Sequence, residues 1–211
     1  MKNLIFLLVW VPIGLLAQRA EFQGEINYEI EYGELPPEME AYSNKLTREV
    51  KWFVGDGWLR SDKDIFPNRH ETNIVSKDRS KGIFAHDIRA MKLAYDYNPS
   101  EWLNYEGTRV ELAEGTKSIS GYLCRRALIY VEGDKEPLEV YYTDQIPAWA
   151  HIFSGDLPGF PLSYENSNGK LKYTVKAVRV IPGPQPEDLF TYPEGYEVVS
   201  QEEFKTRITT Y

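Results

Sequence analysis

Apolar residues recur at every second position in segment after segment of this chain, and this period of two is the feature that most constrains its fold. In the segment 21–32, polar residues alternate with Phe22, Ile26, Tyr28, Ile30 and Tyr32. Successive side chains of a strand point to opposite faces of a sheet, so this alternation indicates a half-buried antiparallel strand. The sequence therefore predicts a protein built mainly of antiparallel strands.

The same alternation returns along most of the chain, separated by turns rich in Gly, Asp and Pro. It predicts hairpins from residues 47–54 and 58–60, 74–75 and 83–85, and 122–131 and 138–143, with single strands at 89–97, 110–112, 170–180 and 196–199. Both faces of the segment Tyr122–Val131 are largely apolar, so we expect that strand to be central in its sheet. Strand signals about 8–12 residues apart predict an antiparallel meander, which must curl or be covered to bury one face.

Short helices are predicted at three places. Prolines and acidic residues favour an amphipathic helix near 35–46, residues 187–190 favour a helical turn, and Ser200 with Glu203 has the spacing of a capping box. Only a short segment follows the proline-rich stretch 182–186, so we expect it to pack back on the same sheet. The predicted fold class is mainly β (α+β): a curved antiparallel sheet or half-barrel with two or three short helices, in one domain over residues 18–211.

The first residues have the layout of a secretory signal peptide. A basic start at Lys2 precedes a continuous apolar run from Leu4 to Leu16, and the small residue Ala17 follows. This predicts removal of residues 1–17 by cleavage near Ala17 and a periplasmic or secreted protein. No later segment is continuously apolar over the roughly 20 residues of a membrane span, so none is expected in the mature chain.

The sequence holds no recognisable catalytic or metal-binding constellation. The net charge of −8 argues against nucleic acid, since phosphate binding needs Lys and Arg. His70, His86 and His151 lie far apart without zinc-ligand spacing, and 62–64 supplies too few oxygens for calcium and reads as a solvated acidic turn. Cys124 lies among apolar neighbours, where burial would leave it unreactive. We therefore expect no metal, no cofactor and no enzyme activity.

Three segments carry a resemblance to a known family. Gly121-Tyr122-Leu123-Cys124, Tyr142-Thr143-Asp144-Gln145-Ile146-Pro147 and Leu157-Pro158-Gly159-Phe160-Pro161-Leu162 occur in the order typical of GLPGLI-type exported proteins of Bacteroidetes, which this chain resembles. It departs from the name-giving motif at Asp156 and at Phe160-Pro161. The resemblance implies a lipoprotein-carrier (LolA-like) half-barrel whose concave apolar face is covered by short helices, and it transfers no catalytic residue.

The connection from Thr143 to Leu162 is the candidate ligand site. Ile146, Trp149, Ile152 and Phe153 have the spacing of one face of a short helix that begins near Pro147, and we expect this face to lie over the concave side of the sheet. The predicted ligand-lining residues are Trp149, Ile152, Phe153, Phe160 and Tyr142. The segment either caps the core or forms a lid over a ligand.

Three functions from different classes follow. The first is a non-enzymatic carrier or binding module that holds an apolar ligand, such as a lipid acyl chain or a peptide, against the concave face. The second is a structural or assembly factor that binds an envelope protein by an exposed sheet edge. The third is an envelope hydrolase. An enclosed apolar cavity of about 300 Å³ or more favours the carrier, and a filled core favours the protein-binding module.

Overall fold

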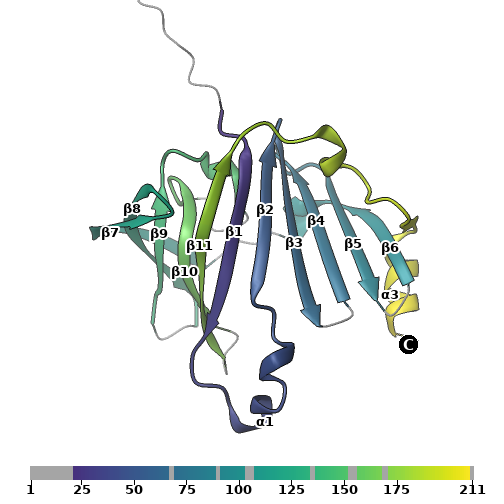
Figure 1. Cartoon of the computed structure of the whole chain (residues 1–211), viewed down its shortest axis with the longest axis horizontal. Helices are drawn as coiled ribbons and strands as arrows, with labels where there is room; N and C mark the ends of the chain where they lie inside the picture. Colours follow the sequence, from purple (N-terminus) through teal and green to yellow (C-terminus); the bar gives the residue numbers. More distant parts are fainter. Residues whose placement is uncertain are drawn as a thin grey trace, which may run out of the picture.

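Twelve strands form a single sheet in the computed structural model, which describes residues 21–66, 69–88, 91–102, 107–133, 136–151, 156–167 and 171–209 (Figure 1). The strands are β1 (Gly24–Tyr32), β2 (Glu49–Gly55), β3 (Trp58–Phe66), β4 (Arg69–Ser76), β5 (Gly82–Ile88), β6 (Met91–Tyr97), β7 (Thr108–Ile119), β8 (Tyr122–Val131), β9 (Leu138–Thr143), β10 (Phe160–Ser167), β11 (Lys172–Pro182) and β12 (Glu197–Val198). The helices are α1 (Pro37–Glu40), α2 (Pro99–Trp102) and α3 (Gln201–Thr209), with 3₁₀ turns η1 (Ser43–Lys45), η2 (Ala148–Ala150) and η3 (Glu187–Phe190). The predicted fold class is confirmed. Residues 1–17, the predicted signal peptide, lie outside the described residues.

Two meanders make up the sheet. The strand order is β12-β6-β5-β4-β3-β2-β1-β11-β10-β9-β8-β7, so β1 to β6 follow one another outward on one side and β11 to β7 on the other. Strands β1 and β11 join the two meanders by antiparallel pairing, and β12 and β6 are the one parallel pair in the described part of the chain. The chain therefore passes from one edge region of the sheet to the other between β6 and β7.

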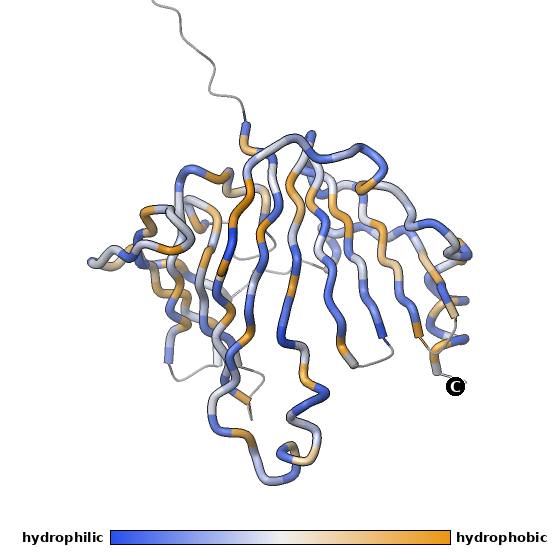
Figure 2. Tube along the Cα trace, viewed as in Figure 1, coloured by the Kyte–Doolittle hydropathy of each residue, from blue (hydrophilic) through white to orange (hydrophobic). Residues whose placement is uncertain are grey.

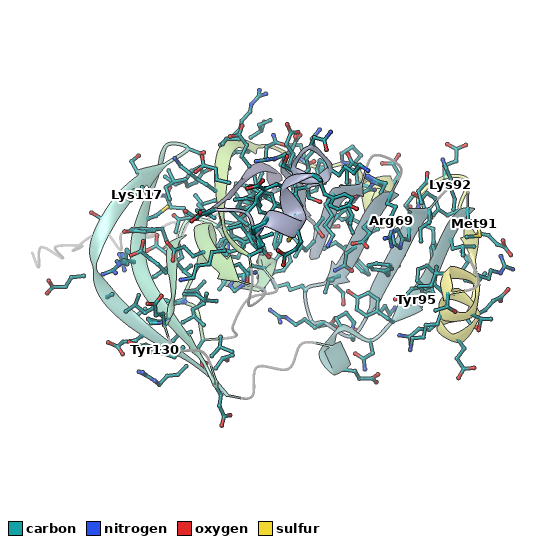
Figure 3. The ribbon with its side chains drawn as sticks, turned by 90° about the horizontal axis from the view of Figure 1, so that it is seen from below. Arg69, Met91, Lys92, Tyr95, Lys117 and Tyr130 are labelled. Carbon is teal, nitrogen blue, oxygen red and sulfur yellow. The ribbon has the colours of Figure 1, made fainter. Side chains whose placement is uncertain are left out.

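This crossing requires the sheet to curve. Ten inter-strand steps separate β6 from β7, which is about 48 Å along the sheet at about 4.8 Å per step. The connection from Tyr97 to Thr108 can span at most about 40 Å when fully extended. Figure 3 looks at the sheet from below and shows the resulting arc, with Tyr130 at one end and Tyr95 at the other.

The expectation that strand Tyr122–Val131 is central was wrong. It is β8, one strand from the edge. Its two apolar faces have another cause: Cys124 and Ala127 point to opposite sides of the strand and are both fully buried, in two different apolar clusters. The predicted hairpin of β8 with β9 is confirmed.

Two of the tight turns have the backbone that their residues predict. Asp56 and Gly57 between β2 and β3 have φ of 40° and 81°, and Ser120 and Gly121 between β7 and β8 have φ of 49° and 84°. Two positive φ values define the type I′ turn, whose twist matches that of the flanking strands. These turns therefore fix the pairing register of both hairpins.

Hydrophobic and hydrophilic residues alternate along the strands (Figure 2), and the core is formed by the buried members of this alternation. On β1, Ile26 and Tyr28 are buried, while the neighbouring Glu25, Asn27 and Glu29 remain at least partly exposed. The largest cluster of buried residues contains Ile26, Tyr28, Ile30, Trp52, Val54, Leu59, Ile119, Cys124, Ile146, Ala150, Phe160, Leu162, Val175 and Ala177. Its members come from both meanders, so packing as well as the β1–β11 ladder holds the two halves together.

The C-terminal segment packs back on the sheet, as predicted. Arg60 Nη1 donates to Leu189 O at 2.9 Å, and the Phe190 ring lies against Gly55. Strand β12 then pairs with β6, and Ser200 Oγ accepts from Glu203 N at 3.1 Å to cap α3. Phe204 of α3 packs on Leu93 and Tyr95, so this segment covers the β6 edge.

The predicted N-terminal helix is present but short. Helix α1 has four residues, none of them buried, and Tyr42 beyond it is 53% exposed. Its apolar residues therefore do not form the buried face that the spacing predicted. Within the described ranges, no helix has both the length and the apolar character needed to span a bilayer.

Candidate functional site

The connection between β9 and β10 crosses the concave side of the sheet. Arg79 Nη2, in the turn between β4 and β5, donates to His151 O at 2.9 Å. Six inter-strand steps separate β9 from β4, so this bond joins distant parts of the sheet. Ile146 of the same segment is fully buried in one cluster with Ile26 and Trp52, from β1 and β2. The segment therefore packs across the face of the sheet that carries the largest cluster.

Its conformation differs from the expected helix. Among the described residues of the connection only η2 is helical, and Pro147 precedes it in an extended conformation with φ −63° and ψ 139°. Ile146 and Ala150 are fully buried in the largest cluster. Ile152 and Phe153, two of the predicted ligand-lining residues, lie outside the described residues.

Trp149 lies at the rim of this segment. Its indole Nε1 donates to Glu21 Oε1 at 2.5 Å, and the Lys77 ammonium lies 5.2 Å from the centre of its ring. Hydrogen bonds from Lys77 and Trp149 lower the pKa of Glu21. Trp149 thus ties the β9–β10 connection to the N-terminus of β1 and to the β4–β5 turn.

The structure separates the other two predicted ligand-lining residues. Phe160 packs edge-to-face on Trp52, with ring centres 5.8 Å apart, in the largest cluster. Tyr142 belongs to a second cluster with Leu157 and Val140. Phe160 pairs with Thr143, the residue after Tyr142, so the Phe160 and Tyr142 side chains point to opposite sides of the ladder. The two side chains therefore do not share one side of the β9–β10 ladder.

The centre of the concave face is filled by the chain itself. Ile26, Ile146, Phe160 and Leu162 keep 0% of their accessible surface. A side chain that lines a void large enough for a water molecule would retain accessible surface, even inside the protein. At these residues the β9–β10 connection therefore caps the core.

Charged groups line the same face of the sheet nearer the closed edge. Lys63 Nζ lies 3.0 Å from Glu71 Oε2, and His86 Nε2 lies 3.5 Å from Glu71 Oε1. His86 is 4% exposed and stacks on Phe204. Burial lowers the pKa of His86, and the Glu71 carboxylate opposes this shift. A neutral imidazole next to an ion pair under a helix is a structural arrangement rather than an accessible reactive site.

The carboxylates proposed as a solvated acidic turn lie on strand β3 instead. Asp62 accepts from Arg60 Nε at 2.9 Å and 3.0 Å and from Thr72 Oγ1 at 2.7 Å. Asp64 Oδ1 lies 2.8 Å from His70 Nδ1. The oxygens already have protein partners, and among the residues that the structure describes no group of three His, Cys, Asp or Glu side chains could hold a metal ion.

Cys124 is buried, as predicted. It has no exposed surface, and burial raises the pKa of its thiol to about 11. The thiolate is the reactive form, so this cysteine is poorly suited to nucleophilic chemistry near neutral pH.

Strand β7 is the feature that the sequence did not reveal. It spans twelve residues, lies at the end of the strand order, and within the described part of the chain pairs only with β8. Leu112 on it is 63% exposed, and Leu123 on β8 is 59% exposed. A bulge between Ala113 and Thr116 shifts the alternation of apolar residues, which is why only Val110 and Leu112 signalled a strand.

Comparisons with known proteins give a fold and no family. No family model matches the sequence, and no curated protein matches it significantly. Two crystal structures of PNGF-II, in space groups P21 and C2, share the fold with TM-scores of 0.57 and 0.55 and identities of 17% and 16%. Each match covers 89% of this chain but only 33% of the PNGF-II chain, so the protein spans about a third of the length of PNGF-II.

Two further structures are more distant. The Mycobacterium tuberculosis lipoprotein LppX has a TM-score of 0.35 and 9% identity, over 72% of this chain and 84% of LppX. A beta-barrel-like protein from Brucella abortus, from a domain family of unknown function, has a TM-score of 0.37 and 7% identity, over 77% of this chain and 98% of its own.

Proposed function

We propose that this protein is an exported, non-catalytic binding module that engages an extended segment of a protein partner at the open β7 edge, as a structural or assembly factor of the cell envelope. One observation carries the proposal: β7 is long and, among the residues that the structure describes, has no strand on its outer side, whereas β12 pairs with β6 at the opposite edge of the same sheet. The GLPGLI-type resemblance, the signal peptide and the periplasmic or secreted location belong to this proposal and are supported by the motifs and the apolar run of the sequence.

The backbone groups available on β7 follow from its pairing with β8. Glu132 N donates to Gly107 O at 2.8 Å, and Tyr130 and Leu128 oppose Arg109 and Glu111. In an antiparallel ladder alternate residues exchange hydrogen bonds with the partner strand, so the odd-numbered residues 107 to 113 bond to β8. Val110 and Leu112 therefore direct their N–H and C=O groups outward, where an added strand would bind them.

Side chains next to this edge supply apolar surface. Val110 and Leu112 lie on the same face of the sheet as Ile129 and Ala127, their partners on β8. Leu112 is largely exposed while Ala127 is fully buried. An extended segment with apolar residues at alternate positions would therefore extend an existing apolar surface as well as the ladder.

Site-specific photo-crosslinking in the native host tests this proposal. A photoreactive residue in place of Leu112 should give a protein adduct, and the same residue in place of Val178, which is 47% exposed on β11, should not. Val110→Pro should abolish the Leu112 adduct, because it removes an outward N–H that β8 does not use.

The thermal midpoint of Val110→Pro should stay within a few degrees of the parent value. Equal adducts at Leu112 and Val178, or a Leu112 adduct that survives the proline, would contradict the proposal.

The apolar-ligand carrier is the second candidate, and one observation favours it. Val110, Val131 and Leu138 are only partly buried where they pack against the second cluster, so this cluster is incompletely covered near β7. A lipid acyl chain could lie along this wall. Native mass spectrometry of protein from its own host would show the retained lipid as added mass, and an unmodified mass would count against the carrier.

A further inference from the structure

We infer that the partner at the β7 edge is a second copy of this chain, paired antiparallel about a two-fold axis through Val110. The inference rests on the function proposed above and adds the identity of the partner and the register of pairing. Its basis is the pattern of charge and backbone groups along residues 107–113.

A two-fold antiparallel pairing of β7 with itself is limited to a few registers. The bulge between Ala113 and Thr116 ends the regular part of the strand. A centre at Arg109 would place two arginines opposite each other, a centre at Glu111 would place two glutamates opposite each other, and a centre at Leu112 would run into the bulge after one residue. Like charges directly opposite are destabilising in a sheet.

A two-fold axis at Val110 pairs opposite charges and also aligns the outward backbone groups for hydrogen bonding. It places Arg109 of each copy opposite Glu111 of the other, so two opposite-charge pairs form across the axis. The Arg109 and Glu111 side chains are 63% and 50% exposed, and within one copy Arg109 Nη1 lies 2.9 Å from Glu111 Oε2. Both side chains therefore lie on the same face and remain accessible to a second copy. Val110 has outward N–H and C=O groups, as a residue at the centre of a hydrogen-bonded pair requires.

The opposite face of the same register is apolar. Val110 would lie opposite Val110 of the other copy, and the exposed Leu112 opposite its Thr108. In a hydrogen-bonded antiparallel pair the Cα atoms are about 5.5 Å apart, close enough for these side chains to touch. The register thus covers Leu112, the most exposed of the large apolar side chains described.

A charge-swap experiment on the full-length mature protein tests the register. Analytical ultracentrifugation of the wild-type protein should show a mass twice that of one chain. Glu111→Lys and Arg109→Glu should each weaken self-association by about tenfold or more, because each places like charges across the axis. An equimolar mixture of the two single variants should form dimers again, because every pair across the axis is then of opposite charge.

A circular dichroism melt of each variant controls for folding, since both side chains are exposed. A wild-type protein that stays monomeric at about 100 µM, single variants that dimerise like the wild type, or a mixture that stays monomeric would each overturn the inference. A Leu112 crosslink to a different protein, with monomeric wild type, would leave the proposed function standing and refute only the second copy.

Discussion

The two edges of the sheet differ in how far other parts of the chain cover them. At β6, the C-terminal segment adds the short parallel strand β12 and then places Phe204 of α3 on Leu93 and Tyr95. At β7, the ladder stops at a twelve-residue strand of which only Ile119 is buried. An unpaired edge invites association, and proteins usually cover or interrupt it. The segment 183–209 packs back on the sheet and reaches the first edge, whereas the second edge carries a bulge and a few charged residues.

The largest expected effect is at the covered edge. Phe204→Ala should lower the free energy of unfolding by about 3–5 kcal/mol, the range for deleting a buried phenylalanine, since Phe204 is 4% exposed and its ring centre lies 4.7 Å from that of Tyr95. Urea denaturation measures this loss, with Val198→Ala, at an exposed position of β12, as the control. A loss below about 1 kcal/mol would show that α3 does not hold this edge.

Acid should weaken the covered edge selectively. The pKa of His86 lies below its ordinary value of 6.5 because the ring is buried, with Arg69 and Lys63 adding to the shift and Glu71 and Asp87 opposing it. The folded state therefore resists protonation while the unfolded chain accepts a proton, so this stabilisation is complete above about pH 6.5 and declines as the pH falls toward the folded-state value, by at most about 1.4 kcal/mol per pH unit.

Hydrogen exchange at pH 7 and pH 5 distinguishes the edges. Amides of β6 should lose protection at the lower pH, and this loss should shrink in His86→Gln. His151 also makes the whole protein less stable as the pH falls, since burial lowers its pKa to about 3. If the β6 amides lose the same protection in the parent and in His86→Gln, protonation of His86 does not cause the loss.

The smallest effect is expected at the open edge. Leu112→Ala should change the free energy of unfolding by about 0.5 kcal/mol or less, because surface substitutions rarely do more. It should nonetheless weaken self-association measured by sedimentation. A stability loss above about 2 kcal/mol would mean that Leu112 is buried within a single copy and that the edges differ less than described.

Local patterns predicted much of the fold. The alternation in 21–32, the turn at Asp56-Gly57 and the cap at Ser200 each depend on residues close in sequence, and all three are present. The strand order was not predictable in this way, since it depends on pairing between β1 and β11. A contact such as Tyr28 Oη donating to Pro161 O at 2.7 Å joins residues 133 apart and leaves no local pattern.

The arrangement of the candidate ligand site could not be predicted from local sequence patterns either. Trp149 and Phe160 do lie in or beside the largest cluster, as their apolar character suggested. A register shift between Pro161 and Ser163 decides which neighbours on β9 share a side with Phe160, and this shift separates it from Tyr142. A bulge adds one residue without changing composition, so neither this one nor the one in β7 could be read from the alternation.

The ladder between β1 and β11 also has a consequence for the order of folding. Of the twelve strands described, β1 comes first in the sequence and β11 second to last, so the side of β1 that faces β11 stays unpaired until the second meander is in place. Closing such a distant pairing is slow because the entropy of the intervening chain must be lost first. A partly folded chain therefore has a second open edge, at β1, which disappears only when the two meanders meet.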